Sequence, residues 1–144
     1  MADEDELGRL SYELQVQQET GEAIRQQIRS MQANIVEIGS AIEAIRNLKK
    51  MKGDALVPIG AGVFISCPKP NPEKIVISIG ANIMMSKPPE DAIKLLEERQ
   101  KKISEAMGMA QQDLGKVISS IESLTQRASA LAAEEDRNVR APKE

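Results

Sequence analysis

The sequence predicts an α+β chain: two long helices that form an antiparallel two-helix coiled coil, joined by two central β-hairpins. Three observations predict this fold class. Apolar residues recur at alternating steps of three and four along residues 5–52 and again along residues 88–135. Between these segments, residues 54–87 are rich in β-branched side chains and are punctuated by glycine and proline. A 3.5-residue apolar period is typical of coiled coils, and the middle composition is typical of strands and turns.

The composition favours long helices over a compact globule. The 144 residues fit one domain, but the only aromatic residues are Tyr12 and Phe64, and there is no tryptophan. The net charge of −3 argues against a nucleic-acid-binding protein, which is normally basic. The chain has no histidine, and its single cysteine, Cys67, excludes an intramolecular disulfide or a multi-cysteine metal site. We expect Cys67 to be a buried structural thiol, and we expect no cofactor and no metal.

The first helix is expected over residues 5–52. The seam is the line of positions, spaced alternately by three and four residues, that should face the other helix. Ten of its twelve positions are apolar, and the two exceptions, Gln17 and Gly21, are adjacent in the series. The twelve positions are Leu7, Leu10, Leu14, Gln17, Gly21, Ile24, Ile28, Met31, Ile35, Ile38, Ile42 and Ile45. Three lysines, Lys49, Lys50 and Lys52, precede Gly53, which suits a left-handed helix cap. We interpret the lysines as a complement to the helix dipole, although they could instead form a patch for a partner.

The middle segment predicts four strands in two hairpins, residues 55–67 and 74–86. Pro58 demotes its strand to an edge or bulged strand, and the proline-rich link 68–73 cannot join a sheet. The segment Ile59–Val63 could suggest a dinucleotide-binding loop, but its third glycine is missing and no helix follows. Isolated hairpins are barely stable in water, so other subunits should cover the apolar side chains of both. The residues expected at this interface are Leu56, Val57, Ile59, Val63, Phe64, Ile65, Ile75, Val76, Ile77, Ile79 and Ile83.

The second helix is expected over residues 88–135, where Pro88–Asp91 supplies a proline and two acids for its first turn. Eleven of its twelve seam positions are apolar, and the exception is Gln100. The twelve positions are Ile93, Leu96, Gln100, Ile103, Met107, Ala110, Leu114, Val117, Ile121, Leu124, Ala128 and Leu131. Opposing seam positions in the two helices sum to 138, as an antiparallel pairing requires. Gln17, Gly21 and Gly115 cluster near the middle of the pair, where we expect a soft joint. Residues 136–144 are expected to be a flexible tail.

The ends of the two helices predict a tentative interaction site. Tyr12 and Val16 lie off the seam and should be exposed, and fraying would uncover the neighbouring seam residues. An apolar surface rimmed by charge is typical of a weak, adaptable site, although these residues could merely complete the coiled coil. The candidate client-binding set is Leu7, Leu10, Tyr12, Leu14, Val16, Leu124 and Leu131.

The order of elements resembles the alpha-type subunits of the prefoldin family, and specifically the archaeal form. The segments that carry the resemblance are Leu56–Ile65 (LVPIGAGVFI) and Lys74–Gly80 (KIVISIG), between two heptad helices. Two departures are the proline-rich Pro68–Pro72 and the Pro88–Pro89 helix start. The resemblance implies a hexamer of two alpha and four beta subunits whose hairpins form a β-barrel base. It also implies an ATP-independent holdase that binds non-native polypeptides at the coiled-coil tips and transfers them to a group II chaperonin.

Two other function classes compete with this one. A structural or tethering coiled-coil scaffold would use the hairpins only to set subunit number. An enzyme is disfavoured, since the sequence lacks histidine, a second cysteine and a convincing glycine-rich loop. The acidic segment Met1–Glu6 does not resemble a signal peptide, and no apolar run reaches membrane-spanning length. We therefore expect a soluble, cytoplasmic protein with no membrane or nucleic-acid partner.

Overall fold

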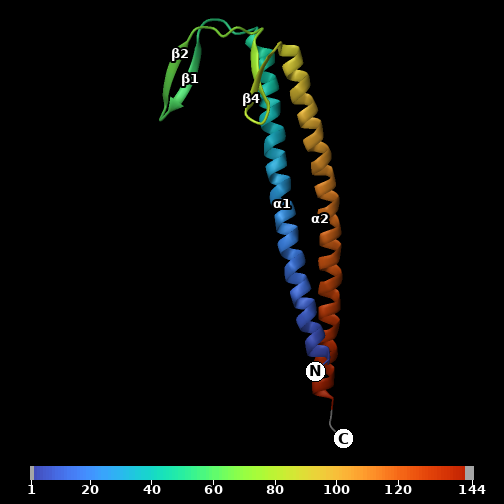
Figure 1. Cartoon of the computed structure of the whole chain (residues 1–144). Helices are drawn as coiled ribbons and strands as arrows, with labels where there is room; N and C mark the ends of the chain where they lie inside the picture. Colours follow the sequence, from blue (N-terminus) through green and yellow to red (C-terminus); the bar gives the residue numbers. More distant parts are fainter. Residues whose placement is uncertain (1, 142–144) are drawn as a thin grey trace. The chain divides into compact units, whose positions relative to one another are not determined.

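The structure is a computed structural model that describes residues 2–141. Along the chain, one long helix precedes two antiparallel hairpins and a second long helix follows them (Figure 1). The elements, in order, are α1 (Ala2–Leu48), β1 (Ala55–Gly60), β2 (Val63–Cys67), β3 (Ile75–Gly80), β4 (Ile83–Lys87) and α2 (Pro89–Arg140). The predicted fold class is confirmed. None of the helices in the described range is both long and apolar enough to cross a membrane.

The chain divides into two compact units, and each helix contributes to both. We call residues 1–32 and 105–144 the end unit, because it holds both termini of the sequence. We call residues 33–104 the hairpin unit, because it contains β1 to β4. In each unit a portion of α1 pairs with a portion of α2, as described below.

The predicted seam is confirmed along both helices. All twelve seam positions of α1 and all twelve of α2 are buried or half-buried, whereas most intervening positions are exposed. The antiparallel register also agrees with the prediction. In the hairpin unit Ile42 packs with Leu96, and in the end unit an added Cβ on Gly21 would lie 3.3 Å from Val117 Cγ1. Both pairs sum to 138, so the alternating pattern alone determined which residues face each other.

The polar exception in the α2 seam, Gln100, has a specific partner in the hairpin unit. Its Nε2 donates a hydrogen bond to the backbone carbonyl of Ile35 over 3.1 Å. Gly39 lies close by: an added Cβ there would lie 3.5 Å from the same nitrogen. A half-buried amide is therefore satisfied by a carbonyl.

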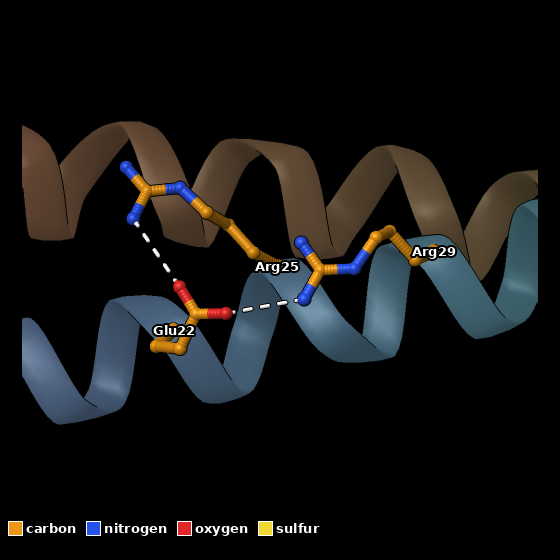
Figure 2. A network of polar contacts seen from close by, with 3 residues as sticks. All are labelled: Glu22, Arg25 and Arg29. Carbon is orange, nitrogen blue, oxygen red and sulfur yellow. Dashed lines mark hydrogen bonds and ion pairs between the residues drawn. The ribbon is translucent and has the colours of Figure 1, made fainter.

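The outward face of the helices carries exposed ion pairs. On α1, Glu22 accepts a hydrogen bond from Arg29 over 3.1 Å and lies 3.9 Å from Arg25 Nη1 (Figure 2). All three side chains are largely solvent-exposed, so each pair contributes at most about 1 kcal/mol. These contacts mark the solvent face of the coiled coil and leave the seam as the main source of its stability.

The end of α1 differs from the prediction. The helix ends at Leu48 rather than Lys52, and residues 49–50 form a turn in which Lys50 N donates to the carbonyl of Asn47. Gly53 has a positive φ of 84°, as a glycine cap would, but it lies beyond the helix. Lys49 follows the last helical turn, and its Nζ lies 3.6 Å from Glu73 Oε1 in the link between the hairpins. All three lysines lie just beyond the last helical residue, Leu48, so their predicted complement to the helix dipole stays a prediction.

Helix α2 begins as expected and extends further than expected. Pro89 is its first residue, Glu90 and Asp91 occupy its first turn, and Ala92 N donates to the carbonyl of Pro88. It continues to Arg140 rather than Glu135. An ion pair of 3.3 Å between Arg140 and Asp136 supports the added turn, where basic side chains also favour the helix dipole. The flexible tail predicted for 136–144 is thus helical through Arg140, and its last residues, 142–144, lie outside the described range.

The two hairpins have the same turn and bulge geometry, and equivalent positions differ by twenty in residue number. In each, a glycine with positive φ (Gly60 at 114°, Gly80 at 105°) precedes a two-residue loop whose residues also have positive φ. The strand register shifts between Pro58 and Gly60 and between Ser78 and Gly80, so Ile59 and Ile79 occupy equivalent bulges. The prediction of a bulged strand at Pro58 is confirmed. The link after Cys67 contains no strand, and Asn71 closes a turn there by accepting hydrogen bonds from Glu73 N and Lys74 N.

The hairpins differ in what covers them. In β3, Ile77 is 7% exposed and packs with Ile42 of α1 and Leu96 of α2. Arg99 adds a hydrogen bond to the carbonyl of Ser78. The corresponding residue in β1 is Val57, and it is 44% exposed. Hairpin β3–β4 is therefore docked on the helices of the hairpin unit through Ile77, whereas the equivalent residue of β1–β2 is exposed. Both hairpins present other apolar side chains to solvent.

Candidate interaction surfaces

The first candidate surface lies in the end unit, where the first half of α1 pairs with the second half of α2. Leu10 and Leu124 are buried in the seam of this pair. Glu6 and Arg127 form an ion pair of 3.5 Å between the two helices. These contacts fix which side chains of the unit face solvent.

The predicted client-binding residues fall into two groups. Leu10 and Leu124 are buried, and Leu7, Leu14 and Leu131 are half-buried, so these five complete the coiled-coil seam. Tyr12 and Val16 are exposed at 69% and 38%, as their positions off the seam predicted. Of the seven predicted residues, only this pair is exposed.

Tyr12 and Val16 border an open groove of about 470 Å³, which we call the serine groove. From α1 it is lined by Tyr12, Glu13, Val16 and Gln17. From α2 it is lined by Ser119, Ser120, Ser123 and Leu124. The groove exists because three small side chains stand where larger ones would fill the space between the helices.

Sequence reasoning missed the three serines. Ser120 directly precedes the seam residue Ile121, and Ser123 directly precedes the seam residue Leu124. Ser119 lies two positions before Ile121. Three small polar residues beside consecutive seam positions were a usable signal, because the antiparallel register had already placed this part of α2 near the turn that carries Tyr12. The apolar period of the seam carries no information on the size of the residues that flank it.

A smaller hollow of about 100 Å³ adjoins the serine groove and shares Glu13 with it. Its other lining residues are Glu6, Arg9, Leu10 and Arg127. The end unit carries fourteen acidic and eight basic side chains, a formal charge of −6, whereas the hairpin unit carries +3. The surroundings of the groove therefore favour positively charged ligands.

The second candidate surface is formed by the hairpins. Most residues expected at a subunit interface are exposed in the single chain, and Leu56, at 69%, is the most exposed of them. Two differ. Ile77 is buried against its own helices, and Ile75 is half-buried, so the prediction that Ile77 contacts another subunit needs correction. Its side chain is already used to dock the hairpin on its own chain.

Cys67 ends β2, opposite Ala55, and is half-buried rather than fully buried as predicted. The difference arises because hairpin β1–β2 is not covered by the helices. Within residues 2–141, no three histidine, cysteine, aspartate or glutamate side chains are grouped as a metal site would require.

Comparison with known proteins identifies a family for this arrangement. A family model described as prefoldin subunit matches residues 17–134. Prefoldin subunit alpha of Thermofilum pendens is 31% identical over 78% of this chain and 89% of that protein. The corresponding subunit of Pyrococcus horikoshii is 30% identical over 85% of each chain. That of Methanobrevibacter smithii is 28% identical over 98% of this chain and 97% of its own.

A solved structure has the same fold. A chain in the cryo-EM structure of filamentous PFD from Methanocaldococcus jannaschii aligns with a TM-score of 0.69 at 23% identity. The alignment covers 78% of this chain and 95% of that one. The similarity therefore extends over helices and hairpins together.

Proposed function

Because the chain belongs to the prefoldin family of chaperone subunits, we propose that it is an ATP-independent holdase subunit that binds non-native polypeptides through its end unit. The observation that carries the proposal is the exposed apolar pair Tyr12 and Val16 beside an open groove. A shallow surface of this kind suits many different apolar segments, each bound weakly. Several such subunits acting together would gain strength through avidity.

The proposal includes an assembly. We expect the chain to join beta-type subunits in a hetero-hexamer of two alpha and four beta chains, with the hairpins forming a β-barrel base. The exposed apolar side chains of β1–β2 support this, because an isolated hairpin of this composition needs a cover. The assembled complex would hold a client and pass it to a group II chaperonin in the cytoplasm. Binding and release by weak apolar contacts need no catalytic step.

An aggregation assay tests the proposed function. A denatured client is diluted into buffer with the assembled complex, and light scattering is followed. We expect the complex to suppress scattering, and we expect Tyr12→Ser with Val16→Ser to weaken the suppression at least threefold in the concentration required. The matched control is Val36→Ser, which also replaces an exposed apolar residue of α1 but lies in the hairpin unit. A complex that forms fully and leaves scattering unchanged would contradict the holdase proposal.

The competing proposal is a scaffold in which the hairpins set subunit number and the helices only span a distance. It predicts an intact oligomer without any effect on client aggregation. It also predicts that the Tyr12 and Val16 substitutions change nothing, because a spacer does not use its exposed side chains. The same assay therefore separates the two functions.

A further inference from the structure

The serine groove combines an apolar patch with hydroxyl groups that have no internal role. Thr20 and Thr125 also lie on helix surfaces, and each donates its hydroxyl to the carbonyl four residues earlier, over 2.8 Å and 2.7 Å. In the part of the chain that the structure describes, the hydroxyls of Ser119, Ser120 and Ser123 form no such hydrogen bond. A serine hydroxyl has one donor and two acceptor positions and rotates freely. Three such groups at one groove are available for a ligand.

The spacing of the serines fits an extended main chain. Ser119 and Ser123 are separated by about 6 Å along the helix axis, since each residue rises about 1.5 Å. Peptide groups on one side of an extended chain repeat about every 6.6 Å. Hydroxyls at these two levels can therefore meet successive N–H or C=O groups on the same side of a bound segment. Tyr12, Val16 and Leu124 then offer an apolar contact for one of its side chains.

The charge of the groove points to one class of segment. Glu13 lines the groove and, among residues 2–141, forms no ion pair. Two cations line the adjoining hollow with Glu13: Arg127 is paired with Glu6, and Arg9 forms no ion pair within residues 2–141. With the formal charge of −6 on the end unit, Glu13 favours a lysine or arginine in the ligand.

We propose that the serine groove binds an extended segment of a non-native polypeptide through its main chain, with one apolar side chain against Tyr12 and a basic side chain near Glu13. This inference rests on the proposed holdase function and specifies the class of ligand. Recognition of the main chain is independent of sequence, so the groove would accept many clients. The basic side chain supplies a bias among them.

The chain contains its own reporter for this test. Tyr12 is the single tyrosine and there is no tryptophan, so tyrosine emission from the full-length chain reports on the groove directly. The probe is an eight-residue peptide of glycine, serine, threonine, leucine and one lysine, which has no aromatic residue. We expect saturable quenching or enhancement of Tyr12 emission. A wild-type chain whose emission does not respond to the peptide would overturn the proposal.

Two changes test main-chain recognition. Ser119→Ala, Ser120→Ala and Ser123→Ala together should weaken peptide binding roughly threefold to tenfold, the effect of losing one or two hydrogen bonds. The matched control is the triple variant Ser30→Ala, Ser104→Ala and Ser129→Ala, which also replaces three exposed helical serines but none that line the groove. Circular dichroism checks that both variants remain helical. A peptide with alternate N-methylated amides should lose a similar factor with the wild type and little more with the groove variant.

The basic side chain is tested separately. Replacing the peptide's lysine by glutamine, or Glu13 by glutamine, should each weaken binding, and the two changes together should weaken it no more than either change alone.

Unchanged affinity in the groove variant and in the N-methylated peptide would overturn main-chain recognition. If the complex still suppressed client aggregation in that case, the holdase function would stand and only the inference about the groove would fail.

Discussion

Two glycines of the end unit show how differently the same residue type can be used. Gly21 is buried in the seam, and an added Cβ there would press on Val117. Gly115 has open space around its Cα, with no atom within 4 Å of an added Cβ. From the sequence, Gly21 counted as a defect of the seam and Gly115 as a helix-weakening glycine near it. The structure shows that Gly21 permits close packing, while Gly115 only lowers helix propensity. The soft joint expected near them stays a prediction.

Gly115→Ala should therefore stabilise the protein by about 0.5–1 kcal/mol, because alanine is the better helix former and meets no obstacle. Gly21→Ala should gain less or lose stability, since Val117 has to shift by a few tenths of an ångström. Urea denaturation at one fixed protein concentration measures both. Equal gains at the two positions would show that the close approach at Gly21 has no energetic consequence.

Gln100 is the second residue whose role depends on its surroundings. Gln100→Ala should destabilise the protein by about 1 kcal/mol, because it removes the hydrogen bond to the Ile35 carbonyl and leaves a small gap beside Gly39. The control is Gln111→Ala, an exposed position on the same helix, where the higher helix propensity of alanine should give no loss. Comparable effects at both positions in thermal unfolding would contradict a specific role for Gln100.

At the scale of elements, turn chemistry was predictable and docking was not. Glycine and β-branched patterns located both hairpins to within one residue, because local backbone preferences dominate there. The two hairpins share their pattern of glycine and β-branched residues, and this pattern does not indicate that Ile77 is buried while Val57 is exposed. That difference comes from Ile77 meeting Ile42 and Leu96, a contact between residues far apart in the sequence. Helix α1 also ends four residues earlier than predicted, at Leu48 rather than Lys52.

The equivalent positions Ile77 and Val57 give a direct test of this asymmetry. Ile77→Ala should cost about 2–4 kcal/mol in the unfolding of the hairpin unit, since it empties a buried site. Val57→Ala should cost well under 1 kcal/mol in the isolated chain, because Val57 is half exposed, but should weaken assembly. Amide hydrogen exchange over residues 75–87 and 55–67 reports on each hairpin separately. Equal loss of protection in both hairpins would contradict the docking of only one.

For the whole molecule, the sequence was sufficient to predict the coiled coil and insufficient to predict its surface. The seam repeats over many turns, so its period and register survive any single exception such as Gln17 or Gln100. The serine groove depends on the volumes of three side chains next to that seam, which no periodicity records. Of the predicted client-binding residues, the two off the seam are exposed and the five on it complete the packing.

The distribution of exposed apolar surface predicts how the whole molecule behaves in solution. Leu56 and Phe64 lie on one face of β1–β2 and are both exposed, so a lone chain would leave this face in water. Native mass spectrometry should therefore find the chain in an oligomer, alone or with a beta-type partner. Leu56→Asp with Phe64→Asp should shift the mass toward the monomer, because charge cannot be buried in that interface without a partner. Tyr12→Asp with Val16→Asp adds the same charge in the end unit and should leave the mass unchanged. A wild-type chain that stayed monomeric both alone and with the partner would contradict the proposal that the hairpins are an assembly surface. Loss of assembly in both aspartate variants would show that the added charge alone disrupts the oligomer.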